Sequence, residues 1–260
     1  MKNRKLVIPF VFLLGTVLIG ALTVGLFLLS GGKAEPIPRP PTVPGEQESG
    51  EEQPQEPVGV VIIDAGHGGE DGGAVGVSGL VEKDLNLDLA KRLAALLEQQ
   101  GFEVIMTRTE DVLLYDRNSD YEGRKKVLDL AARQAIGDAH PDAVFVSIHA
   151  NTFSQPQYHG LQIWYGAGNP GSAALAEQIR CAVVDSLQPD NHRQSKQAGS
   201  NIYLLYHLRN PAVLVECGFL SNPSECKALE DEAYRDRLAH ALCQGIAAYY
   251  ENDACEGRTQ

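Results

Sequence analysis

Positively charged residues are scarce in this sequence. Its 260 residues include 22 lysines and arginines against 34 aspartates and glutamates, which gives a formal net charge of −12 and a pI of about 5.0. Binding to nucleic-acid phosphates needs a basic surface, so we expect no nucleic-acid partner. An anionic polymer surface is disfavoured for the same reason. A neutral or zwitterionic substrate fits this charge better.

Several motifs that would identify other enzyme classes are absent. The glycine-rich stretch from Gly66 fails the dinucleotide-binding pattern because Asp71 stands where a glycine is required, and no lysine completes a phosphate-binding loop. No G-x-S-x-G segment is present. The S-x-x-K at Ser224 to Lys227 lacks the S-D-N and K-T-G segments that accompany it in serine enzymes. The sequence therefore predicts neither a nucleotide-binding enzyme nor a serine hydrolase.

The cysteines offer no framework for a metal knuckle. None of the five forms a C-x-x-C pair, and their odd number excludes a fully paired disulfide framework. We expect them to be small buried residues. A single bridge among Cys226, Cys243 and Cys255 is the alternative.

One long apolar run lies near the N-terminus. Residues 6–30 carry no charge, and a helix of that length spans about 37 Å, enough to cross a bilayer core of about 30 Å. We predict that residues 1–30 form an uncleaved membrane anchor, with a signal sequence as the alternative. Lys2, Arg4 and Lys5 are then cytoplasmic, which places the rest of the chain on the outer side of the membrane.

Residues 31–57 have the composition of a spacer. They hold seven of the fourteen prolines and six glutamates, and such a segment buries too little apolar surface to fold. We predict a disordered linker here, a folded domain over residues 58–251 and a short tail over residues 252–260.

Strands alternate with helices in the folded domain. The pattern predicts strands at 58–64, 102–107, 142–149, 160–165 and 212–217, and helices at 82–100, 124–140, 171–187 and 231–250. This alternation is typical of an α/β sheet that helices cover on both faces.

Two histidines lie at the ends of predicted strands. His67 follows the first strand, and His149 ends the apolar run A-V-F-V-S-I. Ligands of open α/β sheets bind beyond the carboxyl ends of the strands. Taken singly, His67 also fits a polar loop residue, and His149 fits a core histidine bonded to backbone.

Two glutamates stand where apolar residues are expected. Glu82 shares one helix face with Leu85, Leu89, Leu93 and Leu96. A first-turn glutamate is favoured by the helix dipole, but a carboxylate on an apolar face also needs a cation or a strong donor. Two imidazoles and one carboxylate, with a fourth position open, make the ligand set of a catalytic zinc site.

Glu216 lies in the apolar segment P-A-V-L-V-E-C-G-F. It fits a general base beside such a metal, because a zinc hydrolase needs a group that takes a proton from water and returns it to the leaving nitrogen. A structural buried acid paired with Arg108 or another base is the alternative.

Four segments together resemble a known family. D-A-G-H-G-G-E-D-G-G-A-V-G, G-L-V-E-K-D-L-N-L, V-S-I-H-A-N and V-E-C-G-F-L-S-N are similar to the zinc-dependent N-acetylmuramoyl-L-alanine amidases of bacterial cell walls, over about residues 58 to 250. The resemblance implies one Zn²⁺ per chain held by His67, Glu82 and His149, with Glu216 as the catalytic carboxylate. It also implies a single three-layer α/β domain with a mixed, mostly parallel sheet flanked by helices.

The resemblance implies a peptidoglycan hydrolase. Family members cleave the amide between the lactyl group of N-acetylmuramic acid and L-alanine of the stem peptide. Some carry a long helical insertion that covers the zinc, for which residues 152–159 leave no room, so we expect an open site. The anchor and the absence of a wall-binding domain resemble sporulation amidases of the CwlD type, which act ahead of muramic lactam formation in spore cortex.

Three further residues are candidates near the site. Asp64 fits a carboxylate that orients an imidazole, or one that caps the glycine loop. Asn151 fits a substrate donor or a turn residue. Arg108 fits a partner for an acid near the site, or a surface residue.

Two other functions stay open at this point. One is a different zinc hydrolase, such as a peptidoglycan deacetylase. The other is a non-catalytic wall-binding module held at the membrane.

Overall fold

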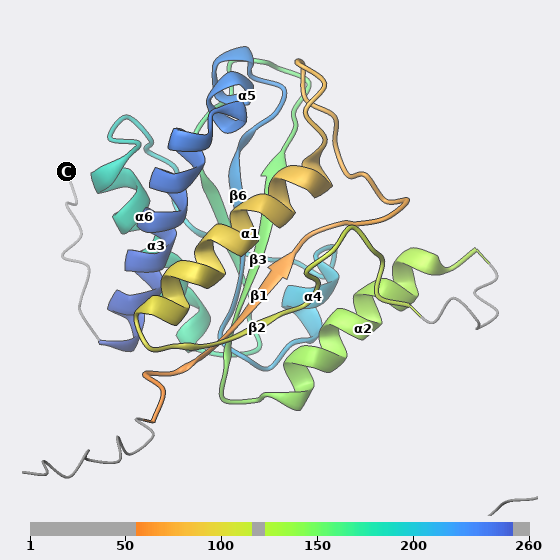
Figure 1. The fold of residues 1–260 in the computed structure, drawn as a ribbon, viewed down its shortest axis with the longest axis vertical. Helices are drawn as coiled ribbons and strands as arrows, with labels where there is room; N and C mark the ends of the chain where they lie inside the picture. The colour runs from red at the N-terminus through yellow and green to blue at the C-terminus, as the bar shows by residue number, and fades with distance from the viewer. Residues whose placement is uncertain (1–55, 116–122, 252–260) are drawn as a thin grey trace, which may run out of the picture. The chain divides into compact units, whose positions relative to one another are not determined.

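The computed structural model describes residues 56–115 and 123–251 (Figure 1). The predicted anchor, all but the end of the predicted linker and the predicted tail lie outside these ranges. None of the helices within the described ranges is both long and apolar enough to cross a bilayer.

Strands and helices alternate along the described chain. The strands are β1 (Val60–Ala65), β2 (Glu103–Met106), β3 (Val144–Asn151), β4 (Gln162–Tyr165), β5 (Lys196–Gln197) and β6 (Ala212–Phe219). The helices are α1 (Glu82–Gln99), α2 (Lys125–Ala139), α3 (Gly171–Ser186), α4 (Tyr203–His207), α5 (Pro223–Glu230) and α6 (Glu232–Tyr250).

The strands form one mixed sheet in the order β2-β1-β3-β6-β4-β5. β2, β1, β3 and β6 run parallel to one another, β4 runs antiparallel to β6, and β5 is parallel to β4. The predicted mixed, mostly parallel sheet is confirmed. Because β1, β3 and β6 are parallel, their carboxyl ends meet at one edge of the sheet (Figure 1).

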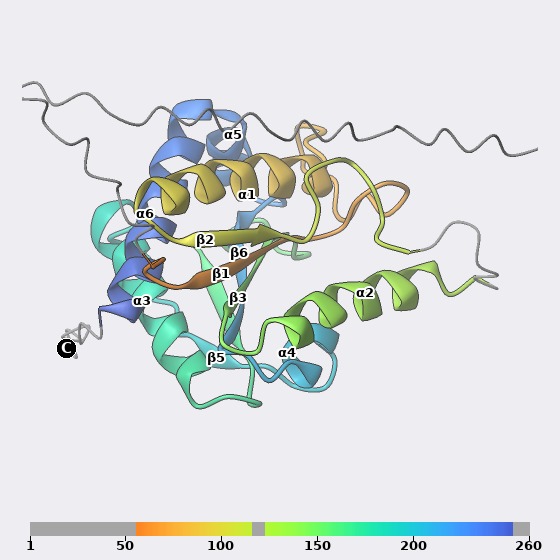
Figure 2. The same cartoon turned by 60° about the horizontal axis from the view of Figure 1, so that its bottom comes forward.

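Helices cover both faces of the sheet (Figure 2). Val61, Ile63 and Ala65 pack in the core with α1, α3 and α6, whereas Ile62 packs in a second core with residues of α4 and α2. Alternate residues of β1 thus face opposite layers. The predicted three-layer architecture is confirmed.

All nine predicted elements are present with ends within two residues of the prediction. β5, α4 and α5 were not predicted. β5 and α4 have two and five residues, too few for a periodic pattern. α5 had a signal, because Asn222 caps it by accepting from the amides of Ser224 and Glu225, and Pro223 is its first residue.

Three of the four cysteines of the described chain behave as small core residues, whereas the fourth, Cys181, is half-buried and disulfide-bonded, so the expectation is wrong for Cys181. Cys217, Cys226 and Cys243 are free and buried. The alternative of a bridge among Cys226, Cys243 and Cys255 is therefore wrong, since two of these three thiols are unpaired.

Candidate active site

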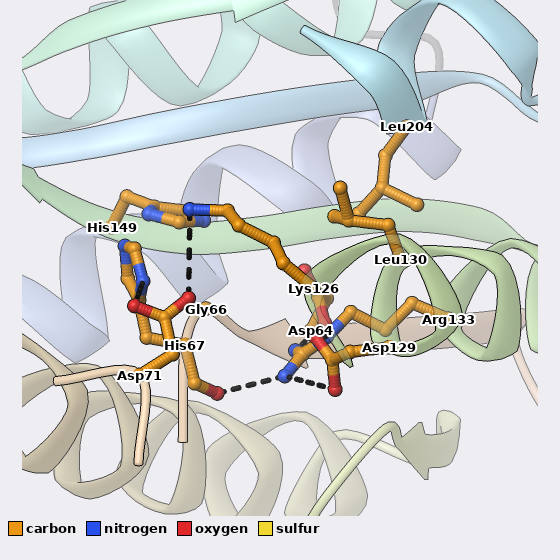
Figure 3. A pocket seen from close by; sticks show the side chains of 10 residues that line it. All are labelled: Asp64, Gly66, His67, Asp71, Lys126, Asp129, Leu130, Arg133, His149 and Leu204. Atoms are coloured by element: carbon orange, nitrogen blue, oxygen red, sulfur yellow. Dashed lines mark hydrogen bonds and ion pairs between the residues drawn. The ribbon is translucent and has the colours of Figure 1, made fainter. Parts of the chain in front are cut away.

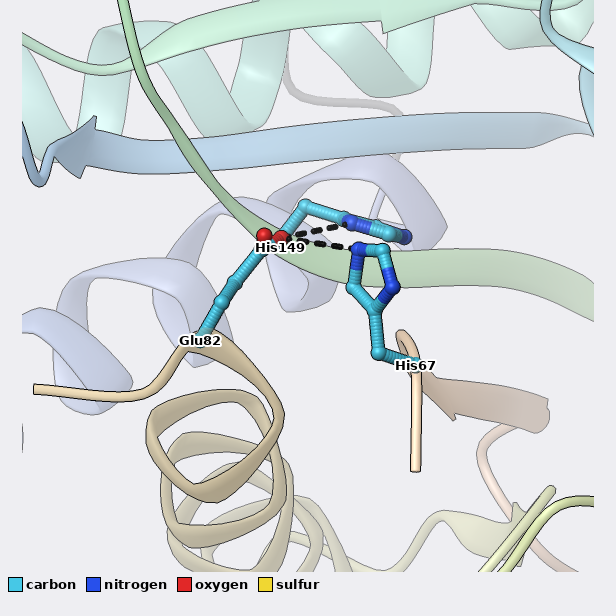
Figure 4. A group of neighbouring side chains, drawn as sticks. All are labelled: His67, Glu82 and His149. Atoms are coloured by element: carbon cyan, nitrogen blue, oxygen red, sulfur yellow. Dashed lines mark hydrogen bonds and ion pairs between the residues drawn. The ribbon is translucent and has the colours of Figure 1, made fainter. Parts of the chain in front are cut away.

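His67, Glu82 and His149 converge at the carboxyl edge of the sheet (Figure 4). One donor atom from each lies within 4.8 Å of the others. A Glu82 oxygen, Oε1, is 3.2 Å from His67 Nε2 and 3.0 Å from His149 Nδ1. Two imidazole nitrogens and one carboxylate oxygen fit a zinc ion that keeps one coordination position open. The three side chains are thus positioned to bind a metal.

The sheet register explains why two of these residues meet. Ala65, the last residue of β1, pairs with Ile148 of β3, so His149 lies one residue beyond the end of β1. His67 follows β1 by two residues. Glu82 is the first residue of α1, which packs on β1 and β3.

Glycines allow the close approach of these side chains. A Cβ at Gly66 would stand 2.2 Å from His149 Nε2, and a Cβ at Gly73 would stand 2.6 Å from Glu82 Oε2. His67 has φ of 62°, the one positive φ outside glycine in the described ranges. Glycine at these positions therefore leaves room for the His149 and Glu82 side chains to lie against the loop backbone.

The carboxylate of Glu82 is buried and fully engaged. Its Oε2 accepts from the amide of Ala74 at 2.8 Å, and its Oε1 accepts from the amide of Ala150 at 3.2 Å. Burial acts to raise the pKa of Glu82, but hydrogen bonds and charge from His149 and His67 outweigh it and hold the pKa well below its usual range. Glu82 is thus ionised at neutral pH and can bind a cation.

Asp71 holds the opposite side of the His67 ring, a contact that the sequence reasoning missed. Its Oδ1 lies 3.0 Å from His67 Nδ1. Its backbone is fixed by two reciprocal hydrogen bonds with Gly68, of 2.9 and 3.0 Å. Burial lowers the pKa of His67, but the carboxylates of Glu82 and Asp71 outweigh it and raise the pKa. An aspartate four residues after a candidate ligand, inside a glycine loop, was the available signal.

Glu216 stands beside the three candidate ligands. It pairs with His149 in the β3–β6 register. Its Oε2 is buried and makes no hydrogen bond within the described chain. Burial raises the pKa of Glu216 to about 7; Glu82 adds to this rise, whereas His149 and His67 oppose it. A carboxylate with an unused oxygen and a pKa near neutrality suits proton transfer.

Arg108 is not the partner of Glu216. It is buried, and its guanidinium donates to the carbonyls of Ala65, Gly66, Lys83 and Glu110 at 2.8 to 3.0 Å. The predicted pairing with an acid near the site is wrong, because all four of these bonds end on backbone oxygen. Arg108 instead fastens the glycine loop to the start of α1.

Asp64 does not orient an imidazole through a described hydrogen bond. It accepts from Arg133 at 2.5 Å, from Thr107 at 2.8 Å and from Ser147 at 2.5 Å. Burial acts to raise the pKa of Asp64, but the Arg133 charge and these donors lower it overall. Asp64 therefore holds Arg133, which in turn donates to the backbone of the loop after β1.

Arg133 of α2 was not a sequence candidate. It is 1% exposed and donates to Asp64, to the carbonyls of Ala65 and His67 at 2.8 and 2.7 Å, and to Asp129 at 2.8 Å. Its spacing from Asp129, one helical turn, is also the pattern of an ordinary surface ion pair. Only the packing of α2 on the sheet shows that this pair is buried.

A pocket opens over the site on the α2 face (Figure 3). Its lining includes His67, His149 and Asp71 together with Lys126 of α2 and Leu204 of α4. Lys126 Nζ lies 3.5 Å from Asp71.

The connection from β3 to β4 leaves the site uncovered by any helix of its own. Residues 152–161 of this connection contain no helix, as predicted from its length. The third candidate, Asn151, ends β3, where its carbonyl accepts from the amide of Leu220 at 2.7 Å.

Residues 61–248 match the sequence model of a family described as N-acetylmuramoyl-L-alanine amidase. The germination-specific N-acetylmuramoyl-L-alanine amidase of Bacillus subtilis (strain 168) is 35% identical over 193 residues, which cover 74% of this chain and 79% of that protein.

Solved structures show the same likeness. The structure of the CwlD amidase from Clostridioides difficile in complex with the GerS lipoprotein is 38% identical, with a TM-score of 0.70 over 75% of this chain and 100% of that chain. The amidase AmiC2 of Nostoc punctiforme is 31% identical, with a TM-score of 0.65 over 76% of this chain and 99% of that chain.

Proposed function

Because this chain belongs to the N-acetylmuramoyl-L-alanine amidase family, we propose that it hydrolyses the amide between the lactyl group of N-acetylmuramic acid and L-alanine of the stem peptide. The observation that carries the proposal is the convergence of three metal-binding side chains next to Glu216 at one edge of the sheet. These groups match the needs of amide hydrolysis, namely an electrophile and a base.

His67, Glu82 and His149 would hold one Zn²⁺. When bound, this ion polarises the scissile carbonyl and makes water at the site more acidic. Glu82 brings the negative charge that offsets the cation, and its amide donors keep it ionised. The Asp71 carboxylate lies 3.0 Å from His67 Nδ1, a position that favours a proton on Nδ1 and leaves Nε2 facing Glu82 for the ion.

Glu216 is the general base of this proposal. Its unpartnered oxygen takes the proton from the attacking water, and the same carboxyl then gives it to the alanine nitrogen as the C–N bond breaks. The neighbouring strand position of His149 keeps Glu216 beside the metal-binding groups throughout.

Mass spectrometry of digested, purified peptidoglycan tests this function. We expect stem peptides with a new L-alanine amino terminus, produced without a chelator and abolished with one. Release of acetate instead would identify a deacetylase. Binding without cleavage in the presence of added zinc would identify a wall-binding module. The matched relatives, which are named as amidases, favour neither alternative.

We propose a sporulation role, in which the enzyme removes stem peptides ahead of muramic lactam formation in spore cortex. The support is the likeness to a germination-specific amidase and to CwlD. Deleting the gene should eliminate muramic lactam from cortex hydrolysates while vegetative walls stay unchanged. Normal lactam content in the deletion strain would remove this assignment.

We also propose that the predicted anchor places the enzyme at the membrane. Residues 1–30 would hold the chain in the membrane, residues 31–57 would act as a spacer, and residues 58–251 would act on the wall side. The uncharged run at 6–30 and the three basic residues before it support this orientation. Detergent should be needed to extract the full chain from membranes, and release without detergent would contradict an uncleaved anchor.

A further inference from the structure

A β-bulge turns Phe219 toward the face of the sheet that carries the site. His149 pairs with Glu216, but Asn151, two residues on, pairs with Phe219, three residues on, so β6 holds one extra residue. Cys217 and Leu220 belong to the core under α1, α3 and α6, whereas Phe219 does not. Phe219 therefore lies on the same face as Glu216, as expected of bulges that re-aim a side chain near a site.

Arg193 stacks on this phenylalanine. Its guanidinium carbon is 4.7 Å from the centre of the Phe219 ring and 5.6 Å from that of Tyr158. Arg193 Nε donates to the carbonyl of His159 at 2.8 Å, and the Arg193 amide donates to the buried Asn191 at 3.1 Å. The planar group is thus held in one orientation before any ligand arrives.

The terminal nitrogens of Arg193 have no hydrogen-bond partner among residues 56–115 and 123–251, although its charge acts on the carboxylate of Glu225. In the described ranges, its Nη1 and Nη2 make no hydrogen bond or ion pair, although Nε does. Arg108 and Arg133, by contrast, spend their terminal nitrogens on carbonyls and buried aspartates. An oriented guanidinium with two spare donors matches the two oxygens of a carboxylate.

Backbone contacts place Arg193 next to the catalytic edge. Gln162 of β4 pairs with Glu216 in the antiparallel register, and its Nε2 donates to the carbonyl of Gln194 at 2.9 Å. The residue after Arg193 is therefore joined to the strand that neighbours Glu216.

We propose that Arg193 binds a stem-peptide carboxylate and so determines substrate preference. This inference rests on the proposed amidase function. In peptidoglycan, a glutamyl residue follows L-alanine, and its α-carboxyl group is either free or amidated. Arg193 selects the free form. A local cation at this position also offsets the net charge of −12, which would otherwise repel an acidic stem peptide.

Paired synthetic muropeptides test this assignment. One carries the free α-carboxylate and the other carries the amide at the same position, and both are cleaved by the zinc-loaded full chain. We expect wild type to favour the carboxylate substrate. Arg193→Ala should lower kcat/KM for that substrate by about tenfold or more, mainly through KM, and change kcat/KM for the amidated one by less than about threefold. Arg193→Lys, which keeps the charge without the planar fork, should fall between.

Arg237→Ala is the matched control, because Arg237 also stacks on a tyrosine, at 5.8 Å from the Tyr234 ring, but at an exposed position of α6. It should leave both substrates unaffected. An equal loss on both substrates in Arg193→Ala, or no loss on either, would overturn the carboxylate site. Failure of wild type to cleave either substrate would instead refute the amidase function itself.

Discussion

Glu216 shows at the residue scale how position gives a side chain its chemistry. It lies among apolar residues of β6, with one oxygen unpaired and His149 alongside. Its raised pKa follows from burial. Asp64, which is more deeply buried, has a lowered pKa because Arg133, Ser147 and Thr107 bind it. Asp64 and Glu216 therefore differ in role because hydrogen bonds and a cation engage the carboxylate of Asp64, whereas Glu216 keeps an oxygen without a partner among the described residues.

Activity should depend on the ionisation of Glu216. The raised pKa, about 7, means that the carboxyl is protonated at lower pH and becomes a base as the pH rises. A bound cation favours the carboxylate, so kcat/KM should rise with pH through a midpoint at or below about 7. Assays from pH 5 to 8.5 measure this rise of kcat/KM.

Glu216→Gln is the control for that profile. It should retain stoichiometric zinc and lose at least about a hundredfold in kcat, because the amide cannot accept the proton. An unchanged rate in the variant would show that another group is the base.

Asp71 should affect metal affinity without contributing a ligand. Removing a carboxylate that orients a metal-binding histidine typically weakens metal binding by about 10–100-fold. Asp71→Ala should show this loss in competition with a chromogenic chelator. Asp71→Asn, which keeps an oxygen able to lie near His67 Nδ1, should lose less. Equal affinity in Asp71→Ala and wild type would leave Asp71 as a loop residue only.

At the scale of elements, the loop after β1 is held from two sides. Arg108, from the segment after β2, binds the carbonyls of Ala65 and Gly66, and Arg133 of α2 binds those of Ala65 and His67. The loop is rich in glycine and would otherwise be free to move. The two arginines keep His67 in place.

Arg133→Ala should destabilise the domain strongly. It leaves Asp64 and Asp129 buried without their cation, a loss of about 3–5 kcal/mol in the free energy of unfolding. Because the folded pKa of Asp64 lies below 3.8, the stabilisation is present at neutral pH and is lost as the pH falls through that folded value. Urea denaturation at pH 7 measures the difference.

The exposed Arg237→Ala serves as the reference for this loss. It should change unfolding free energy by no more than about 0.5 kcal/mol. A similar small change in Arg133→Ala would show that the buried network contributes little.

At the scale of the whole molecule, metal binding and folding should be coupled. The three proposed ligands come from the loop after β1, from α1 and from β3, and a ligand that binds only the folded state stabilises it. Chelation should lower the melting temperature of the wild-type domain, and added zinc should restore it. His149→Ala should show neither response. A chelator effect that persists in His149→Ala would place the metal elsewhere.

Much of this fold could be predicted from the sequence because the patterns that indicate helices and strands are local. The alternation of apolar runs predicted nine elements, and strand ends located His67, His149 and Glu216. The helical stripe that begins at Glu82 depends only on a repeat of three to four residues.

Strand order, register and the roles of the arginines were decided by the tertiary structure. Arg133 and Asp129 show the spacing of a surface pair, and Arg193 stands in a polar segment. The contacts of Arg133 with Asp64 and of Arg193 with Phe219 join residues far apart in the sequence, so the local sequence does not show them. The bulge that aims Phe219 arises only when β6 pairs with β3. The sequence by itself determined the helices and strands and the places of His67, Glu82, His149 and Glu216 in them, because periodicity and residue type act over a few positions. Tertiary structure determined which of them meet, because the contacts of Arg108 with Gly66, of Arg133 with Asp64 and of His149 with Glu82 join residues 40 or more positions apart.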